Sequence, residues 1–173
     1  ITIRVRNCFV QLPDAGFRPR RFDPRSSFFS SVIFHDFAAS LEDPPDTHYA
    51  LRHRLEKQDP AAAVSAPVQP IVYYLDRGAP EPMRTALLEG GRWWNRAFEA
   101  AGFRDAFRLE LLPEGADPMD IRYNMINWVP RGTRGFSNGK TIWDPRTGEI
   151  IQGTVTLTAG RDRQLRMIAE ALL

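Results

Sequence analysis

The stretch that decides the fold is Ile71-Val-Tyr-Tyr-Leu75, a short run of apolar β-branched and aromatic residues. It is too short for a helix and suits a strand that is buried on both faces. A pattern of helical spacing follows from Pro80 or Pro82 to Ala101, and Phe107 to Leu112 then predicts a second strand. A strand, a crossover helix and a strand of these lengths predict parallel pairing with a right-handed crossover.

The expected helix carries its own end signal. Gly102 stands where a helix closes in left-handed geometry. Gly90 and Gly91 lie inside the helix and weaken it, so we expect the helix to approach the sheet closely there. Trp94 and Phe98 recur at helical spacing, which favours a place in the core over a stacking platform for sugars or bases.

The remaining pattern completes a sheet. A third strand is predicted at Ile121–Val129. The turn Asp144-Pro-Arg-Thr-Gly148 predicts a hairpin between strands around Thr141–Trp143 and Glu149–Thr158. A helix is expected from Arg161 to the last residue. The fold class predicted is mixed α/β (α+β): a twisted, mostly parallel sheet with an antiparallel edge hairpin and a long helix packed on one face.

The first third of the chain predicts a separate segment. Ile1–Val5 and Cys8–Leu12 alternate as strands do, and Tyr49–Glu56 alternates again. Between them lies a proline-punctuated loop rich in phenylalanine, which needs a surface to bury against. We therefore expect residues 1–60 to be an extended, strand and loop segment of an upstream domain, residues 61–69 to be a linker, and residues 70–173 to be a second domain.

Composition narrows the function classes. The chain has 173 residues, 43% hydrophobic and 25% charged, with a net charge of +2. Only Lys57 and Lys140 are lysines, and the arginines are spread along the chain, so no nucleic-acid surface is expected. No apolar run is long enough to span a bilayer. Cys8 is the only cysteine, so an intrachain disulfide and a cysteine-rich zinc site are excluded.

Three stretches taken together carry a family resemblance: Arg54–Lys57 with Asp59-Pro60, then Pro70–Asp76 leading into Trp93-Trp-Asn95 and Ala97–Phe103, and finally Asp144–Ile150. In this order they resemble a family of large bacterial zinc-dependent metalloproteases related to the metzincins. The resemblance covers nearly the whole chain. It implies a mostly parallel sheet with one antiparallel edge strand, backed by helices and lying above an active-site helix that carries His-Glu-x-x-His. This chain would then be a truncated, metzincin-like N-terminal subdomain.

The zinc motif itself is missing from this sequence. The two histidines of that motif hold Zn²⁺ and its glutamate activates a bound water. The histidines here are His35, His48 and His53, and none of them pairs at i, i+4. We therefore assign no metal ligand and no catalytic residue to the chain, expect it to be inactive alone with no cofactor, and expect the zinc helix beyond Leu173 in the complete protein. The resemblance also implies a periplasmic or secreted location.

Other chemistry-bearing residues have ordinary interpretations. His48 and His53 could share a metal with Asp46, but a separation of five on an alternating strand sends the side chains to opposite faces, which favours polar surface histidines. The carboxylates nearest strand ends suit turn chemistry better than an acid and base pair; they are Asp76, Asp117, Asp120 and Glu149. The run from Arg131 to Gly135 fits a loop before an edge strand better than a phosphate cradle, because no helix follows it.

One substrate-binding site follows from the resemblance. In such peptidases an extended peptide or protein substrate adds to the antiparallel edge strand through backbone hydrogen bonds. The candidate residues lie at the start of that strand: Gly135, Phe136, Ser137, Asn138 and Gly139. The two glycines would let another backbone come close. An ordinary hairpin with a covered edge is the alternative for this strand, and a non-enzymatic α+β protein-binding or inhibitory module is the alternative for the whole chain.

Overall fold

The computed structural model describes residues 2–3, 5, 7–26, 31–130 and 137–172. The chain forms two compact units. Unit 1 comprises Ile1–Arg52 and Trp143–Ile151, and unit 2 comprises His53–Ile142 and Gln152–Leu173. Unit 1 is therefore built from two separate stretches of chain, and the second of them is the predicted hairpin turn.

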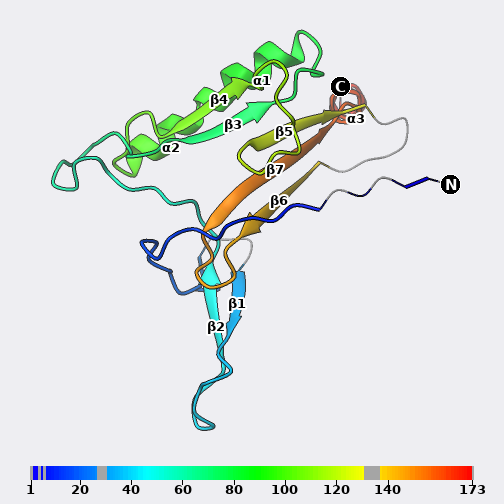
Figure 1. Cartoon of the computed structure of the whole chain (residues 1–173). Coiled ribbons are helices and arrows are strands. Elements are labelled where there is room, and N and C mark those ends of the chain that lie inside the picture. Colours follow the sequence, from blue (N-terminus) through cyan, green and yellow to red (C-terminus); the bar gives the residue numbers. More distant parts are fainter. Residues whose placement is uncertain (1, 4, 6, 27–30, 131–136, 173) are drawn as a thin grey trace. The chain divides into compact units, whose positions relative to one another are not determined.

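Unit 2 is organised around a five-stranded sheet in the order β4-β3-β5-β7-β6. β3 pairs in parallel with both β4 and β5, and β5 pairs in parallel with β7. β6 is the terminal strand and runs opposite to β7 (Figure 1). The predicted fold class is therefore confirmed. The strands are β3 Ile71–Leu75, β4 Phe107–Leu111, β5 Asn124–Val129, β6 Asn138–Trp143 and β7 Ile150–Thr158.

The helix between β3 and β4 has two segments, α1 (Met83–Arg92) and α2 (Trp94–Ala100), which lie nearly end to end in Figure 1. Trp93 separates them but keeps right-handed helical angles, so the axis continues. The end is as predicted. Gly102 has φ of 85°, and the amide of Phe103 donates to the Phe98 carbonyl at 2.8 Å.

The predicted close approach of the helix to the sheet occurs at one of the two glycines. A Cβ on Gly91 would lie 2.8 Å from the Cβ of Leu109 on β4, whereas a Cβ on Gly90 would meet nothing within 4 Å. The prediction is therefore right for Gly91 and wrong for Gly90. Gly90 points outward because one residue rotates a helix by about 100°.

The core of unit 2 is made by small and aliphatic side chains from the central strands and their flanks, namely Leu75, Ala79, Ala106, Leu112 and Met125. Phe98 is half-buried and its ring stacks on that of Phe107, with centroids 6.2 Å apart. The placement of Trp94 in the core is wrong, because 62% of its surface is exposed. α2 packs on β4, which is a terminal strand of the sheet. The side chain of Trp94 is therefore not enclosed.

Two asparagines tie these elements together. The Asn95 side chain donates to the Phe107 carbonyl at 2.8 Å and accepts from the Phe107 amide at 3.0 Å, which fixes α2 to the start of β4. The Asn124 side chain on β5 donates to the Val72 carbonyl at 2.8 Å and accepts from the Gly153 amide at 2.7 Å. One residue of the central strand thus holds both of its neighbours in register.

Residues 61–69, expected as a linker, are bonded into unit 2. Ser65 is 6% exposed, its amide donates to the Gly102 carbonyl at 3.2 Å, and its carbonyl accepts from the Arg104 amide at 2.9 Å. The Lys57 ammonium donates to the carbonyls of Ala62 and Ala63, each at 2.8 Å. This stretch therefore behaves as a packed loop at the end of α2.

Unit 1 contains the antiparallel pair β1 (Ser31–His35) and β2 (Asp46–Ala50). β2 ends before most of the predicted Tyr49–Glu56 strand, and beyond Ala50 that stretch has a single isolated bridge, at Arg52. The strands predicted within residues 1–12 are wrong for the described residues there, none of which belongs to a strand. Their apolar side chains have no partner strand to bury them, and Ile3 and Phe9 are 78% and 100% exposed.

The last element is α3 (Gly160–Ala171), at the position of the predicted final helix. Its expected apolar stripe is not buried, since Ile168 and Leu172 are 48% and 82% exposed. Within the described part of the chain, no helix is both long and apolar enough to cross a membrane.

Candidate functional site: an apolar pocket and an edge strand

Unit 2 has an apolar pocket of about 440 Å³ on the sheet face that carries α1 and α2. Residues in register share a face of a sheet. Because Tyr73 is in register with Leu109, which contacts Gly91 of α1, the pocket and the helix lie on the same side. The wall is formed by side chains from β3, β4, β5, β7 and α2, together with His53. Its residues are His53, Ile71, Tyr73, Trp94, Phe98, Phe107, Ile126, Val155 and Leu157.

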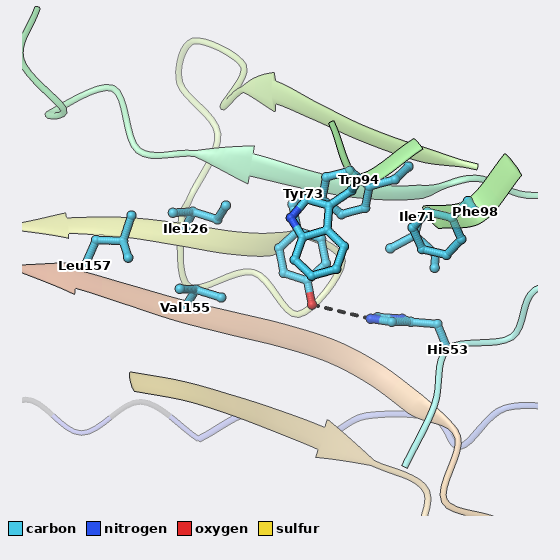
Figure 2. Close-up of a pocket in the computed structure, with 9 residues that line it drawn as sticks. His53, Ile71, Tyr73, Trp94, Phe98, Ile126, Val155 and Leu157 are labelled. Carbon is cyan, nitrogen blue, oxygen red and sulfur yellow. Dashed lines mark hydrogen bonds between the residues drawn. The ribbon is translucent and has the colours of Figure 1, made fainter. Parts of the chain in front are cut away.

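Tyr73 divides the pocket. Figure 2 shows its ring between two sets of side chains. Aliphatic side chains of β5 and β7 lie on one side, and Ile71 and Phe98 lie on the other. Its hydroxyl points toward His53. Burial raises the pKa of the Tyr73 hydroxyl, so this group stays protonated at neutral pH.

His53 supplies the second polar group of the wall. Its Nε2 lies 3.4 Å from the Tyr73 hydroxyl oxygen, and the two rings meet edge to face with centroids 6.0 Å apart. Burial lowers the pKa of His53 to about 4, so the ring is neutral at pH 7. The expectation of a polar surface histidine is therefore wrong here. β2 ends at Ala50, so the alternation of a strand no longer applies at His53.

The pocket can bind a neutral apolar group. Its volume falls in the range of ligand pockets, roughly 300–1,000 Å³, and its tyrosine hydroxyl and histidine ring already face each other. No carboxylate lines it, so the histidine has no acidic partner there for proton transfer. The arrangement suits packing against, or binding of, an apolar group.

Two of the three histidines, His35 and His48, lie in unit 1, and His53 lies in unit 2. In unit 1, Nδ1 of His35 lies 2.7 Å from a carboxylate oxygen of Asp46, on the neighbouring strand. His48 is exposed on β2, where its register partner is Ile33. Across the residues that the structure describes, no group of three or more His, Cys, Asp or Glu side chains could hold a metal ion. The described residues therefore do not fit a zinc site.

Three of the four carboxylates at the ends of strands have the turn roles expected of them, and the fourth, Glu149, is buried. Asp76 accepts the amide of Gly78 at 2.9 Å, and Asp117 accepts the amide of Met119 at 2.8 Å. Asp120 holds Arg122 through contacts as short as 2.6 Å. These are turn contacts over two residues, the pattern that Asp favours in loops.

The predicted substrate-binding residues lie at the start of β6. Gly135 and Phe136 fall outside the described residues, so the structure says nothing of them. Asn138 and Gly139 are exposed in the terminal strand of the sheet, and a Cβ on Gly139 would meet nothing within 4 Å. Ser137 is half-buried, and its Oγ is buried with no hydrogen-bond partner among the described atoms. A buried hydroxyl without a partner is uncommon and requires an explanation.

Sequence reasoning missed the pocket. Its members are dispersed between residues 53 and 157, and only the fold brings them together. One local signal was available. Gly153 interrupts the β-rich run of β7, and an isolated glycine within a strand often marks a close approach of another group. Here that group is the Tyr73 side chain.

Comparison with known proteins adds one match. Residues 1–58 match a family described only as a domain of unknown function (DUF5117), which covers most of unit 1 and the first residues of unit 2. No curated protein and no solved structure matches the chain.

Proposed function

We propose that this chain is the N-terminal part of the catalytic domain of a zinc-dependent metallopeptidase, preceded by an upstream segment. The observation that carries the proposal is the sheet order β4-β3-β5-β7-β6, with parallel strands and one antiparallel strand at the edge. This is the arrangement that the family resemblance implies. The enzyme would be bacterial and periplasmic or secreted, again by resemblance, and its zinc would be held by residues that this chain does not contain.

In this proposal β6 binds the substrate. A terminal strand presents unpaired backbone groups to which an extended peptide can add, and side-chain pockets then give specificity. Asn138, Gly139 and Lys140 are all exposed, so backbone can approach this end of the strand without displacing a large side chain.

The apolar pocket has a role in the same proposal. α1 and α2 pack on β4. The pocket extends from α2 to Ile126, Val155 and Leu157 on β5 and β7 (Figure 2). A neutral, apolar concavity is complementary to the apolar stripe of an amphipathic helix. The helix that carries the zinc ligands, which the resemblance puts beneath the sheet, would cover it in the complete protein.

A proline substitution in the complete protein tests the edge strand. Proline removes one backbone donor and resists pairing, so Ser137→Pro and Asn138→Pro should each reduce peptide hydrolysis at least tenfold. Asn138→Ala is the matched control, since it removes the side chain but keeps the amide, and it should retain activity. Thermal unfolding of every variant shows whether it is folded. Parental turnover in both folded proline variants would exclude β6 as the substrate strand.

A non-enzymatic protein-binding or inhibitory module remains the second candidate, because an open sheet edge and an apolar pocket suit a protein partner equally well. The complete protein separates the two. Bound zinc with hydrolysis of an unfolded protein substrate supports the peptidase. A complete protein that ends without His-Glu-x-x-His and binds no zinc supports the module.

A further inference from the structure

The turn of the edge-strand hairpin belongs to unit 1. Asp144–Gly148 joins β6 to β7, yet it is grouped with Ile1–Arg52. Gly148 has φ of 76°, and a Cβ built on it would lie 2.9 Å from the Ala50 carbonyl oxygen and 3.2 Å from a methyl carbon of Val32. The turn therefore packs directly against the β1–β2 pair, at a distance that only glycine allows.

Backbone hydrogen bonds extend this contact. The amide of Arg52 donates to the Gly148 carbonyl at 3.1 Å, and the amide of Ile150 donates to the Arg52 carbonyl at 2.9 Å. Together they make a parallel bridge between Arg52 and Glu149. The first residues of β7 are thus held by the chain that leaves β2, in addition to the hairpin.

An ion pair between two side chains of the turn, Asp144 and Arg146, stabilises its conformation. Asp144 is 1% exposed, and its carboxylate is 2.6 Å from the Arg146 guanidinium, whose hydrogen bonds hold the pKa of Asp144 below its usual value. The same guanidinium donates to the Pro13 carbonyl at 3.1 Å. The Asp144 amide donates to the Glu149 carbonyl at 2.8 Å and closes the base of the turn. Hydrogen bonds to Arg52 and to Pro13 thus attach the turn to residues 1–52.

We propose that the first segment of unit 1, residues 1–52, is an intramolecular clamp on the turn Asp144–Gly148, and that Gly148 is the positioning residue through which this segment holds the turn of the β6–β7 hairpin. β6 ends at Trp143, which is followed directly by Asp144, the first residue of the clamped turn. A slip of one residue in a strand reverses the face of every side chain, so a fixed turn sets the register that β6 offers. The substrate of that strand rests on the proposed function, but the clamp does not.

Hydrogen exchange on the 173-residue chain, read by mass spectrometry, tests the clamp. Gly148→Ala should accelerate exchange of the β6 amides at least tenfold and leave β3 and β4 at parental rates. Gly115→Ala is the matched control: Gly115 has φ of 74°, so alanine meets the same backbone strain, but nothing lies within 4 Å of its Cβ position. This control should leave β6 unchanged.

A second pair of variants keeps the test decisive if Gly148→Ala does not fold. Arg146→Gln removes the contacts to Asp144 and Pro13, and it should accelerate β6 exchange severalfold. Its control is Arg122→Gln, which removes the equivalent contact to Asp120, also 2.6 Å, outside the hairpin. Unchanged β6 exchange in the folded hairpin variants, or equal acceleration of β3 and β4, would overturn the clamp.

The complete protein supplies a readout that separates the two proposals. If β6 binds substrate and the clamp sets its register, Gly148→Ala should raise KM for a long peptide more than it lowers kcat. A complete protein with no hydrolytic activity would contradict the proposed function and leave the exchange result standing. Unchanged exchange would contradict the clamp whatever the activity.

Discussion

The Tyr73 hydroxyl occupies the space that a Cβ on Gly153 would take. Tyr73 lies on β3 and Gly153 on β7, with β5 between them, so the ring reaches across the central strand. The same glycine donates its amide to the Asn124 side chain at 2.7 Å. The position of the ring that divides the pocket therefore depends on the absence of a single methyl group.

Gly153→Ala should lower the free energy of unfolding by about 1–3 kcal/mol, because the new methyl group forces the Tyr73 ring from its place. Chemical denaturation measures this. Tyr73→Phe in the same chain should restore part of the loss, since it removes the nearest clashing atom. A Gly153→Ala variant as stable as the parent would show that the Tyr73 ring moves freely.

His53 should make the chain less stable in mild acid. Its pKa is about 4 when folded and near 6.5 when unfolded, so between these values the unfolded state binds the additional proton. The free energy of unfolding should therefore fall as pH decreases from 6.5 to 4, by up to about 3 kcal/mol. Urea unfolding at pH 7, 5.5 and 4 measures it. His53→Leu should flatten this slope, and an unchanged slope would assign the effect to other groups.

The adjacent glycines of α1 should respond to alanine with opposite signs. Gly90→Ala should stabilise the chain by about 0.5–1 kcal/mol, because alanine favours the helix and its Cβ points into open space. Gly91→Ala should destabilise it by about 1–3 kcal/mol, because its Cβ would overlap Leu109. The two melting curves, compared with the parent, report the packing of α1 on β4. Equal effects would contradict that packing.

Purified protein of this sequence should carry no stoichiometric zinc. No histidine pair has ligand spacing, and Cys8 has no second cysteine to join it. Elemental analysis after dialysis is the measurement. About one tightly held zinc per chain would contradict the expectation, and substitution of His35 and Asp46, which already lie 2.7 Å apart, would then be the first test of its location.

The strand, helix and strand unit was predictable because its signals are local. Ile71–Leu75 is a compact apolar run, and Gly102 ends the helix as left-handed caps do. Trp94 was not predictable from spacing. Periodicity shows which side chains share a helix face, but the width of sheet beneath that face decides which of them are covered.

The candidate site could not be predicted from local sequence patterns, because it is formed by contacts between residues far apart in the sequence. His53 lies within a stretch that alternates as a strand does, yet the strand ends at Ala50 and the histidine lies in a pocket wall. The turn Asp144–Gly148 was correctly predicted as a turn. Its burial against Ala50 and Val32 was not, because that contact joins residues nearly a hundred positions apart.

The discontinuous unit 1 has a consequence for how this chain can evolve. The family match ends at residue 58, but the compact unit also requires Trp143–Ile151, which is encoded far downstream. Recombination at the end of the match would separate Val32 and Ala50 from the glycine that covers them. The first segment and the hairpin should therefore be inherited together, and among homologous sequences a larger residue at position 32 should accompany changes in the turn.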